Sequence, residues 1–152
     1  MILLIADAFH KQVLCKKYLF MKSVLSKIAY ILLLFNGFGA LYGGVRLITQ
    51  PDGSSLGLPL SLLANSPFHD FLIPGILLLL SNGVASIGAS ISFTLKPRKL
   101  AWVIWAQGVI LLIWLIVQVI MIKTLHPLQF ILGAVGVALI WLGREIASKQ
   151  TP

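Results

Sequence analysis

The chain has 152 residues, of which 59% are hydrophobic and 11% are charged, and its mean hydropathy is +0.99. Soluble globular proteins carry about 45–50% apolar and about 25% charged residues, so this composition excludes that class and indicates a membrane protein. The net charge of +8 comes from basic residues that lie beside apolar runs. This placement favours contact with anionic lipid headgroups over nucleic-acid binding.

Residues 1–23 form a basic N-terminal segment that is too polar to span a bilayer. Its apolar run is interrupted by Lys11, Lys16 and Lys17. Two interpretations are open: an amphipathic segment in the membrane interface, or an upstream extension that precedes a native start at Met21. The second is favoured, because a basic residue directly before an apolar run is typical of a first membrane segment.

Four apolar runs follow, each long enough to cross about 30 Å of hydrocarbon as a helix. They predict an all-α fold: a four-helix transmembrane bundle in one domain over residues 24–146, with a polar tail at 147–152. The predicted spans are residues 24–48, 71–95, 100–122 and 128–146. A proline at position 74 fits the first turn of the second span.

Small residues recur at helical spacing in the first two spans. Gly39 and Gly43 have the GxxxG spacing that lets another helix approach closely, and Ser86 and Ser90 recur four residues apart in the second span. These four residues are predicted helix-packing positions, whether the neighbouring helix belongs to this chain or to a partner.

Amide side chains supply most of the polarity inside the spans. Gln107, Trp114 and Gln118 fall on one face of the third span at three- and four-residue steps. Two interpretations are open: each amide bonds across the bundle as structural glue, or the amides line a polar pocket for a ligand headgroup. The candidate pocket residues are Asn36, Asn82, Gln107, Trp114, Gln118 and Gln129.

The long segment between the first two spans, from Thr49 to Gly75, is the main non-apolar part of the chain. Pro51-Asp52-Gly53 is a turn signal, and Asp70 is placed to cap the following helix. The apolar stretch within it predicts a short interfacial helix over Pro59 to Ala64, lying across the mouth of the bundle.

Charge counting predicts how the chain is threaded. Ten of the twelve basic residues fall on one side if both termini are cytoplasmic, which leaves Arg46 and Lys123 on the other side. The positive-inside rule therefore predicts a multi-pass protein of the inner cell membrane with both termini cytoplasmic and the long loop outside.

Ionisable groups on the loop side form a second candidate site. Arg46, His69, Asp70 and His126 are all predicted at that side, where Asp70 would orient a histidine and Arg46 would bind an anionic headgroup. The alternative is structural: Asp70 caps a helix and the histidines reach water at the interface. No metal site is predicted, because the histidines and Asp70 lack a metal-ligand spacing.

Several chemistries are disfavoured by what the spans lack. No Asp or Glu lies near the middle of a predicted span, which disfavours small proton-coupled exporters and sterol isomerases that use buried acids. Cys15 is the only cysteine, so thiol redox chemistry within one chain is excluded.

Two functions stay open after these exclusions. The first is an accessory or interaction component without catalytic machinery or cofactor, whose partners are the lipid bilayer and another membrane protein or a second copy. The second is a small-ligand or lipid-handling protein, which includes the case of an enzyme, with a polar pocket under the outer loop.

The loop also carries a longer motif. It comprises Pro51-Asp52-Gly53, Leu56-Gly57-Leu58-Pro59, Leu62-Leu63, Ser66-Pro67-Phe68, Asp70-Phe71 and Ile73-Pro74-Gly75, followed later by Trp114, Gln118 and the run from His126 to Gln129. This pattern resembles a set of small bacterial four-helix inner-membrane proteins and, more distantly, the DoxX-like group. The resemblance implies the fold and a membrane location and brings no established activity. The chain differs from DoxX-like proteins in lacking an acidic residue within its early helices.

Overall fold

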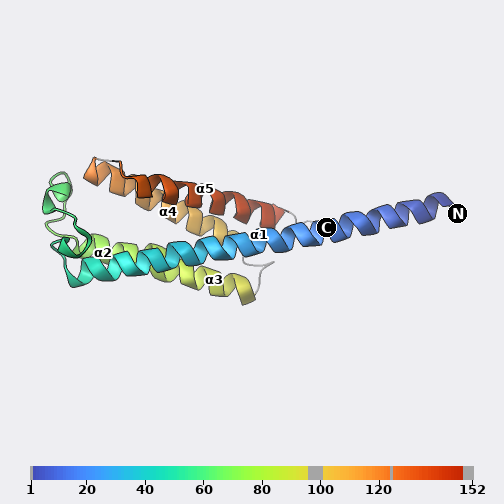
Figure 1. Cartoon of the computed structure of the whole chain (residues 1–152), viewed down its shortest axis with the longest axis horizontal. Coiled ribbons are helices and arrows are strands. Elements are labelled where there is room, and N and C mark those ends of the chain that lie inside the picture. The colour runs from blue at the N-terminus through green and yellow to red at the C-terminus, as the bar shows by residue number, and fades with distance from the viewer. Residues whose placement is uncertain (1, 96–100, 124, 149–152) are drawn as a thin grey trace.

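The structure is a computed structural model that describes residues 2–95, 101–123 and 125–148, without the side chains of residues 2–11, 13–19 and 22. Helices make up almost all of this part of the chain, and no strand occurs in it. The helices are α1 (Ile2–Thr49), η1 (Ser54–Leu56), η2 (Leu60–Leu63), α2 (Leu72–Leu78), η3 (Leu79–Val84), α3 (Ala85–Leu95), α4 (Ala101–Ile122) and α5 (Pro127–Ser148). Figure 1 shows their arrangement as a bundle of long, nearly parallel and antiparallel helices.

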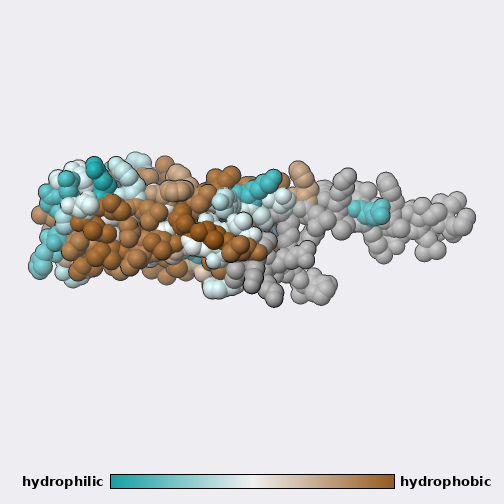
Figure 2. Space-filling model, turned by 90° about the horizontal axis from the view of Figure 1, so that it is seen from below, coloured by the Kyte–Doolittle hydropathy of each residue, from teal (hydrophilic) through white to brown (hydrophobic). Residues whose placement is uncertain are grey.

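Four stretches of helix in the described residues are long and apolar enough to cross a membrane, as the sequence predicted. They are Ser23–Thr49, Leu72–Leu95, Ala101–Ile122 and Pro127–Ser148. Large apolar side chains cover their outer surface, and Figure 2 shows this surface as a broad hydrophobic band with hydrophilic residues gathered at one end. The four-helix transmembrane fold and the multi-pass membrane location are therefore confirmed.

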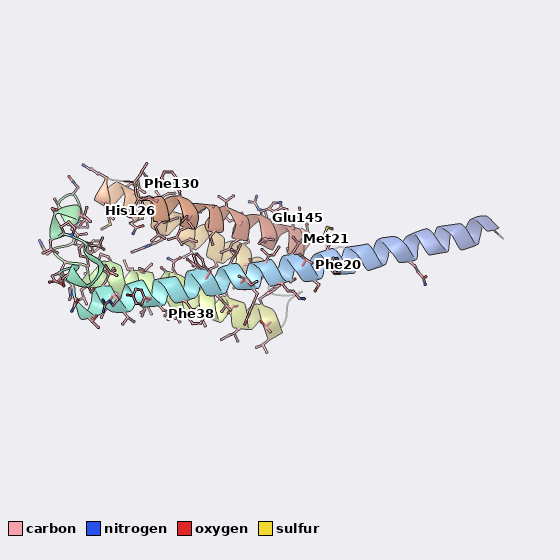
Figure 3. All side chains as sticks on the ribbon, viewed as in Figure 1. Phe20, Met21, Phe38, His126, Phe130 and Glu145 are labelled. Atoms are coloured by element: carbon pink, nitrogen blue, oxygen red, sulfur yellow. The ribbon has the colours of Figure 1, made fainter. Side chains whose placement is uncertain are left out.

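The basic N-terminal segment joins the first span without a break in helix α1. Phe20 and Met21 lie where α1 leaves the bundle, and the helix continues outward from there (Figures 1 and 3). The basic turn predicted at residues 96–99 and most of the polar tail, residues 149–152, lie outside the described residues.

The bundle is built from two helical hairpins. One consists of α1 packed along α2, η3 and α3, and the other of α4 packed along α5. Both hairpins meet in one apolar core between the helices. Its buried residues are Ala29, Leu33, Ala89, Phe93, Ala101, Ile104, Leu111, Leu115, Val135, Leu139, Leu142 and Ile146.

A second apolar cluster closes the end of the bundle that carries residues 50–71, here named the loop end. Leu47 of α1, Leu63 of η2 and Phe71 before α2 are buried together, and Met121 of α4 packs against them. The predicted short helix in the loop is therefore present as η2, a 3₁₀ helix, and it ties the two hairpins together at the loop end. The Lys123 Nζ donates to Asn65 Oδ1 at 3.1 Å, which adds a polar link between the same parts.

The second span contains a π-helical turn, η3, between α2 and α3. At its end the Ala85 N–H bonds to the Leu80 carbonyl, five residues back. This hydrogen bond bypasses the Ser81 carbonyl, which would be the acceptor in an α-helix. Such turns are rare and frequently lie at functional sites, so η3 places its polar residues in an unusual backbone setting.

Candidate functional site

The polar interior begins with a bond between α1 and α3. Asn36 and Ser86 are both buried, and Asn36 Nδ2 donates to Ser86 Oγ at 2.8 Å. A bond of this kind inside a membrane bundle contributes about 0.6–2 kcal/mol. Asn36 therefore acts as a hydrogen-bonding link between two helices of the chain itself.

The π-helical turn makes the corresponding link to α4. Gln107 is buried, and its Nε2 donates to the Ser81 carbonyl at 3.1 Å. This is the carbonyl that the Ala85 N–H bypasses, so Gln107 supplies a hydrogen-bond donor that the π-helical turn leaves out. The sequence indicated Gln107 as a candidate, but its partner could not be predicted, because every residue has a backbone carbonyl.

Among the described residues, Asn82 has the one fully buried side-chain oxygen or nitrogen without a hydrogen-bond partner. Its Nδ2 donates to Ser81 Oγ at 3.1 Å, while its Oδ1 is buried and has no partner among the described residues. The side chain is fully buried. A buried amide oxygen without a donor is costly, and such atoms occur mainly at strained or functional positions.

The remaining candidate pocket residues do not join this group. Trp114 and Gln118 are half-buried on α4. Gln129 instead caps α5: its Oε1 accepts from the backbone N–H of His126 at 2.9 Å, just before Pro127 at the helix start. Two surface grooves of the described residues, one between α4 and α5 and the other between α1 and α3, are not lined by Asn36, Asn82, Gln107 or Gln118.

One of these grooves lies between α4 and α5 and has a volume of about 350 Å³. Gln129 lines it, together with apolar side chains such as Leu115 and Phe130 and the open Gly133. Asn36 thus bonds to Ser86, and Gln107 and Asn82 both bond to Ser81, while Gln129 faces a different space.

The four ionisable residues of the loop side keep to local partners. Arg46 Nη2 donates to the Ser55 carbonyl at 3.2 Å, and its guanidinium lies 5.9 Å from the centre of the Tyr42 ring. Asp70 Oδ1 accepts from the Leu72 N–H at 3.0 Å and so satisfies one N–H in the first turn of α2, from one residue ahead of Phe71 at the N-cap position. His69 and His126 are exposed.

No hydrogen bond or ion pair joins any two of these four side chains in the described part of the chain, and no cluster of three His, Cys, Asp or Glu residues forms there. Figure 3 shows His126 at the loop end, beside the start of α5. The arrangement matches the structural alternative, in which Asp70 caps a helix and the histidines lie at the surface.

The turn at the start of the loop is held by a carboxylate. Gly53 has a φ of 78°, which a residue with a Cβ rarely adopts, and the Cβ would also lie 2.3 Å from the Leu58 carbonyl. Asp52 Oδ1 accepts from the Ser54 hydroxyl at 2.7 Å and from the Ser54 N–H at 3.1 Å. The hydrogen bond from the Ser54 hydroxyl lowers the pKa of Asp52 below its ordinary value, and the bond from the Ser54 N–H adds to this shift.

The glycines divide into closed and open positions. A Cβ on Gly37 would lie 2.7 Å from Ile87, and one on Gly44 would lie 2.7 Å from Leu79 and 3.0 Å from the Gly75 carbonyl. These glycines therefore permit the close approach of α1 to α2 and α3. Gly75, Gly83, Gly108, Gly136 and Gly143 are equally tight.

The predicted packing residues are Gly39 and Gly43 on α1 and Ser86 and Ser90 on α3. Nothing lies within 4 Å of a Cβ placed on Gly39, and only Leu78, at 3.5 Å, lies that close to one on Gly43. Ser86 and Ser90 are buried in the interior, where Ser90 Oγ donates to the Ile87 carbonyl. Within the chain, α1 packs most closely through Gly37 and Gly44; Gly43 is at ordinary contact distance from Leu78, and Gly39 has no such neighbour.

Comparison with protein-family models, with curated proteins and with solved structures finds no match to this chain. The fold itself defines the class: the described residues form a multi-pass helical membrane protein, with four stretches of helix long and apolar enough to span a bilayer.

Proposed function

We propose that this chain is a non-enzymatic interaction component of a membrane, and that it assembles with a second copy of itself through α1. The observation that carries the proposal is the contrast among its glycines. Those at Gly37 and Gly44 are closed by the chain's own helices, whereas Gly39 is open to the outside of the bundle.

The surface around Gly39 is here named the open face of α1, and it consists of Phe35, Phe38, Gly39 and Tyr42, with Gly43 at its edge. The three aromatic side chains are 53%, 62% and 63% exposed. They lie beside a glycine that has no side chain of its own, on a surface that the chain's other helices leave exposed. Phe38 lies near the middle of the first span, Ser23–Thr49 (Figure 3).

A GxxxG surface suits a second copy better than an unrelated helix. Its two glycines let identical backbones approach closely, and van der Waals packing drives such contacts in lipid. A two-fold dimer pairs the same patch on both copies, so one open face per chain is sufficient. The buried amides support the same function, because Asn36 and Gln107 already bond within the chain.

Energy transfer between labelled copies in lipid vesicles tests this proposal. Wild-type chains should transfer energy at high lipid dilution. Gly39→Leu should abolish the transfer, because a leucine side chain at this position would keep the two α1 helices apart. Gly88→Leu is the matched control, since nothing lies within 4 Å of a Cβ at Gly88 on α3 either. Equal transfer in wild type and Gly39→Leu would refute the proposal.

The orientation in the membrane is part of the same proposal. The end opposite the loop, here named the basic end, carries Lys27 and Arg144, and its sequence contributes most of the basic residues. We place this end in the cytoplasm of the cell and the loop end outside. A fluorescent protein fused after Pro152 should fluoresce and an alkaline phosphatase fused there should be inactive; the reverse result would contradict the orientation.

A small-ligand or lipid-handling function is the second candidate, and the unpaired Asn82 Oδ1 favours it. A molecule with a hydrogen-bond donor would satisfy this oxygen. Extraction of the purified protein and mass spectrometry should then release about one such molecule per chain from wild type and none from Asn82→Leu. A wild-type protein that releases nothing would contradict this candidate.

A further inference from the structure

The second groove lies at the basic end, between α1 and α3, and has a volume of about 450 Å³. Its lining combines a cation, hydroxyl groups and an apolar floor. The lining residues are Ser23, Ser26, Lys27, Tyr30, Ile31, Phe93 and Thr94. Volumes of about 300–1,000 Å³ are usual for ligand sites in proteins.

The depth of this groove corresponds to the membrane surface. The first span begins at Ser23 and the second span ends at Leu95, so the groove lies at the boundary of both spans. Lys27 is exposed there, and its long side chain can keep the ammonium group among the headgroups. The groove is therefore placed where a phospholipid has its phosphate.

The charge on the lining of the groove is positive and comes from Lys27. No acidic residue lines it, and none occurs in residues 21–31 or 93–100, the two stretches that contain the lining. Lys27 therefore complements an anion and does not favour a zwitterion.

The rest of the lining distinguishes a lipid from a soluble anion. Phe93 is buried at the floor and Ile31 is exposed beside it, with Ile91 exposed farther along α3. These side chains provide a path for an acyl chain toward the middle of the membrane. Ser23, Ser26 and Tyr30 also line the groove, whereas the Thr94 hydroxyl already donates to the Ser90 carbonyl.

We propose that the groove between α1 and α3 is a binding site for an anionic phospholipid, with the phosphate at Lys27 and an acyl chain over Phe93 and Ile31. The walls of the site are α1 and α3 of one chain, so a single copy forms it, although Ile31 lies one helical turn from Phe35 of the open face. Basic pockets between transmembrane helices recognise anionic headgroups by this combination of charge and apolar surface.

Native mass spectrometry of the full chain, titrated with phosphatidylglycerol or phosphatidylcholine of the same acyl chains, tests the site. Wild type should bind phosphatidylglycerol about fivefold more tightly or better, the contribution expected of one basic residue at an anionic headgroup. Lys27→Gln should remove this preference and Lys27→Arg should keep it.

Lys123→Gln is the matched control, because it removes the same charge at the loop end. It should leave the preference for phosphatidylglycerol unchanged. Ser26→Leu should weaken both lipids by filling the groove, and millimolar inorganic phosphate should displace neither. Equal binding of the two lipids by wild type, equal effects of Lys27→Gln and Lys123→Gln, or displacement by phosphate would each overturn the proposal.

Discussion

Two sides of helix α1 contain the same residue type and have opposite environments. Gly37 and Gly44 are seven residues apart and therefore lie on nearly the same side of the helix, where α2 and α3 cover them. Gly39 is two residues from Gly37, about 200° around the helix, and has nothing within 4 Å. The angular position of a glycine on α1 therefore decides whether it lies against another helix of the chain or on the outer surface of the bundle.

The largest expected effect is on the closed side. Gly44→Leu would place a side chain against Leu79 and the Gly75 carbonyl, and the backbone cannot yield there without separating α1 from α2. Overpacking of this kind costs about 1–3 kcal/mol or more. Titration of the purified protein with a denaturing detergent, followed by circular dichroism, should show a clear loss of stability.

Gly39→Leu in the same assay should leave the stability of the chain within about 0.5 kcal/mol of wild type, as for a surface change. Energy transfer between labelled copies of Gly39→Leu should nevertheless be lost, although the single chain keeps its stability. If Gly39→Leu destabilised the chain as much as Gly44→Leu, the distinction between the two sides of α1 would be wrong.

A smaller effect is expected in the polar interior, where Asn36 and Asn82 form a second pair to compare. Asn36→Leu removes the donor to Ser86 and should cost about 0.6–2 kcal/mol. Asn82→Leu removes a carbonyl oxygen that has no partner among the described residues, together with a donor to the neighbouring Ser81, so it should cost less than Asn36→Leu. The same detergent titration measures both variants, and a larger loss for Asn82→Leu would indicate that Asn82 binds a ligand.

The smallest effect is expected at the loop end and only in acid. The Ser54 hydroxyl lowers the pKa of Asp52, so the carboxylate stabilises the turn above its ordinary pKa of 3.8. This stabilisation is lost as the pH falls through the still lower pKa of the folded chain. Protease cleavage of the loop should therefore be constant from pH 7 to about pH 4 and rise below it.

Asp52→Asn is the matched variant for this experiment. It keeps the shape of the side chain and removes the titrating group, so its loop should be cleaved at the same rate on both sides of pH 4. A wild-type loop whose cleavage followed the variant at every pH would contradict the role of the carboxylate.

The sequence predicted the four spans to within a few residues, because long apolar runs can only satisfy their backbone in lipid as helices. It also predicted the short helix in the loop, since the apolar stretch that contains Leu63 needs a surface to cover. These features depend on local composition and length, which a single sequence contains.

Other features depend on contacts between distant residues and could not be predicted in this way. The partner of Gln107 is a carbonyl exposed by the π-helical turn, and nothing in the local residue types predicts that turn. The closed side of α1 was also missed, because GxxxG at Gly39 is the more familiar spacing. The seven-residue step from Gly37 to Gly44 was the available signal.

Cysteine cross-linking in native membranes tests the assembly through α1 most directly. In a Cys15→Ser background, Gly39→Cys and Gly88→Cys each place one thiol at an open glycine, on α1 and on α3 respectively. Mild oxidation should give a covalent dimer with Gly39→Cys and little or none with Gly88→Cys. Equal cross-linking of the two variants, or cross-linking through Gly88→Cys alone, would contradict the assembly through α1.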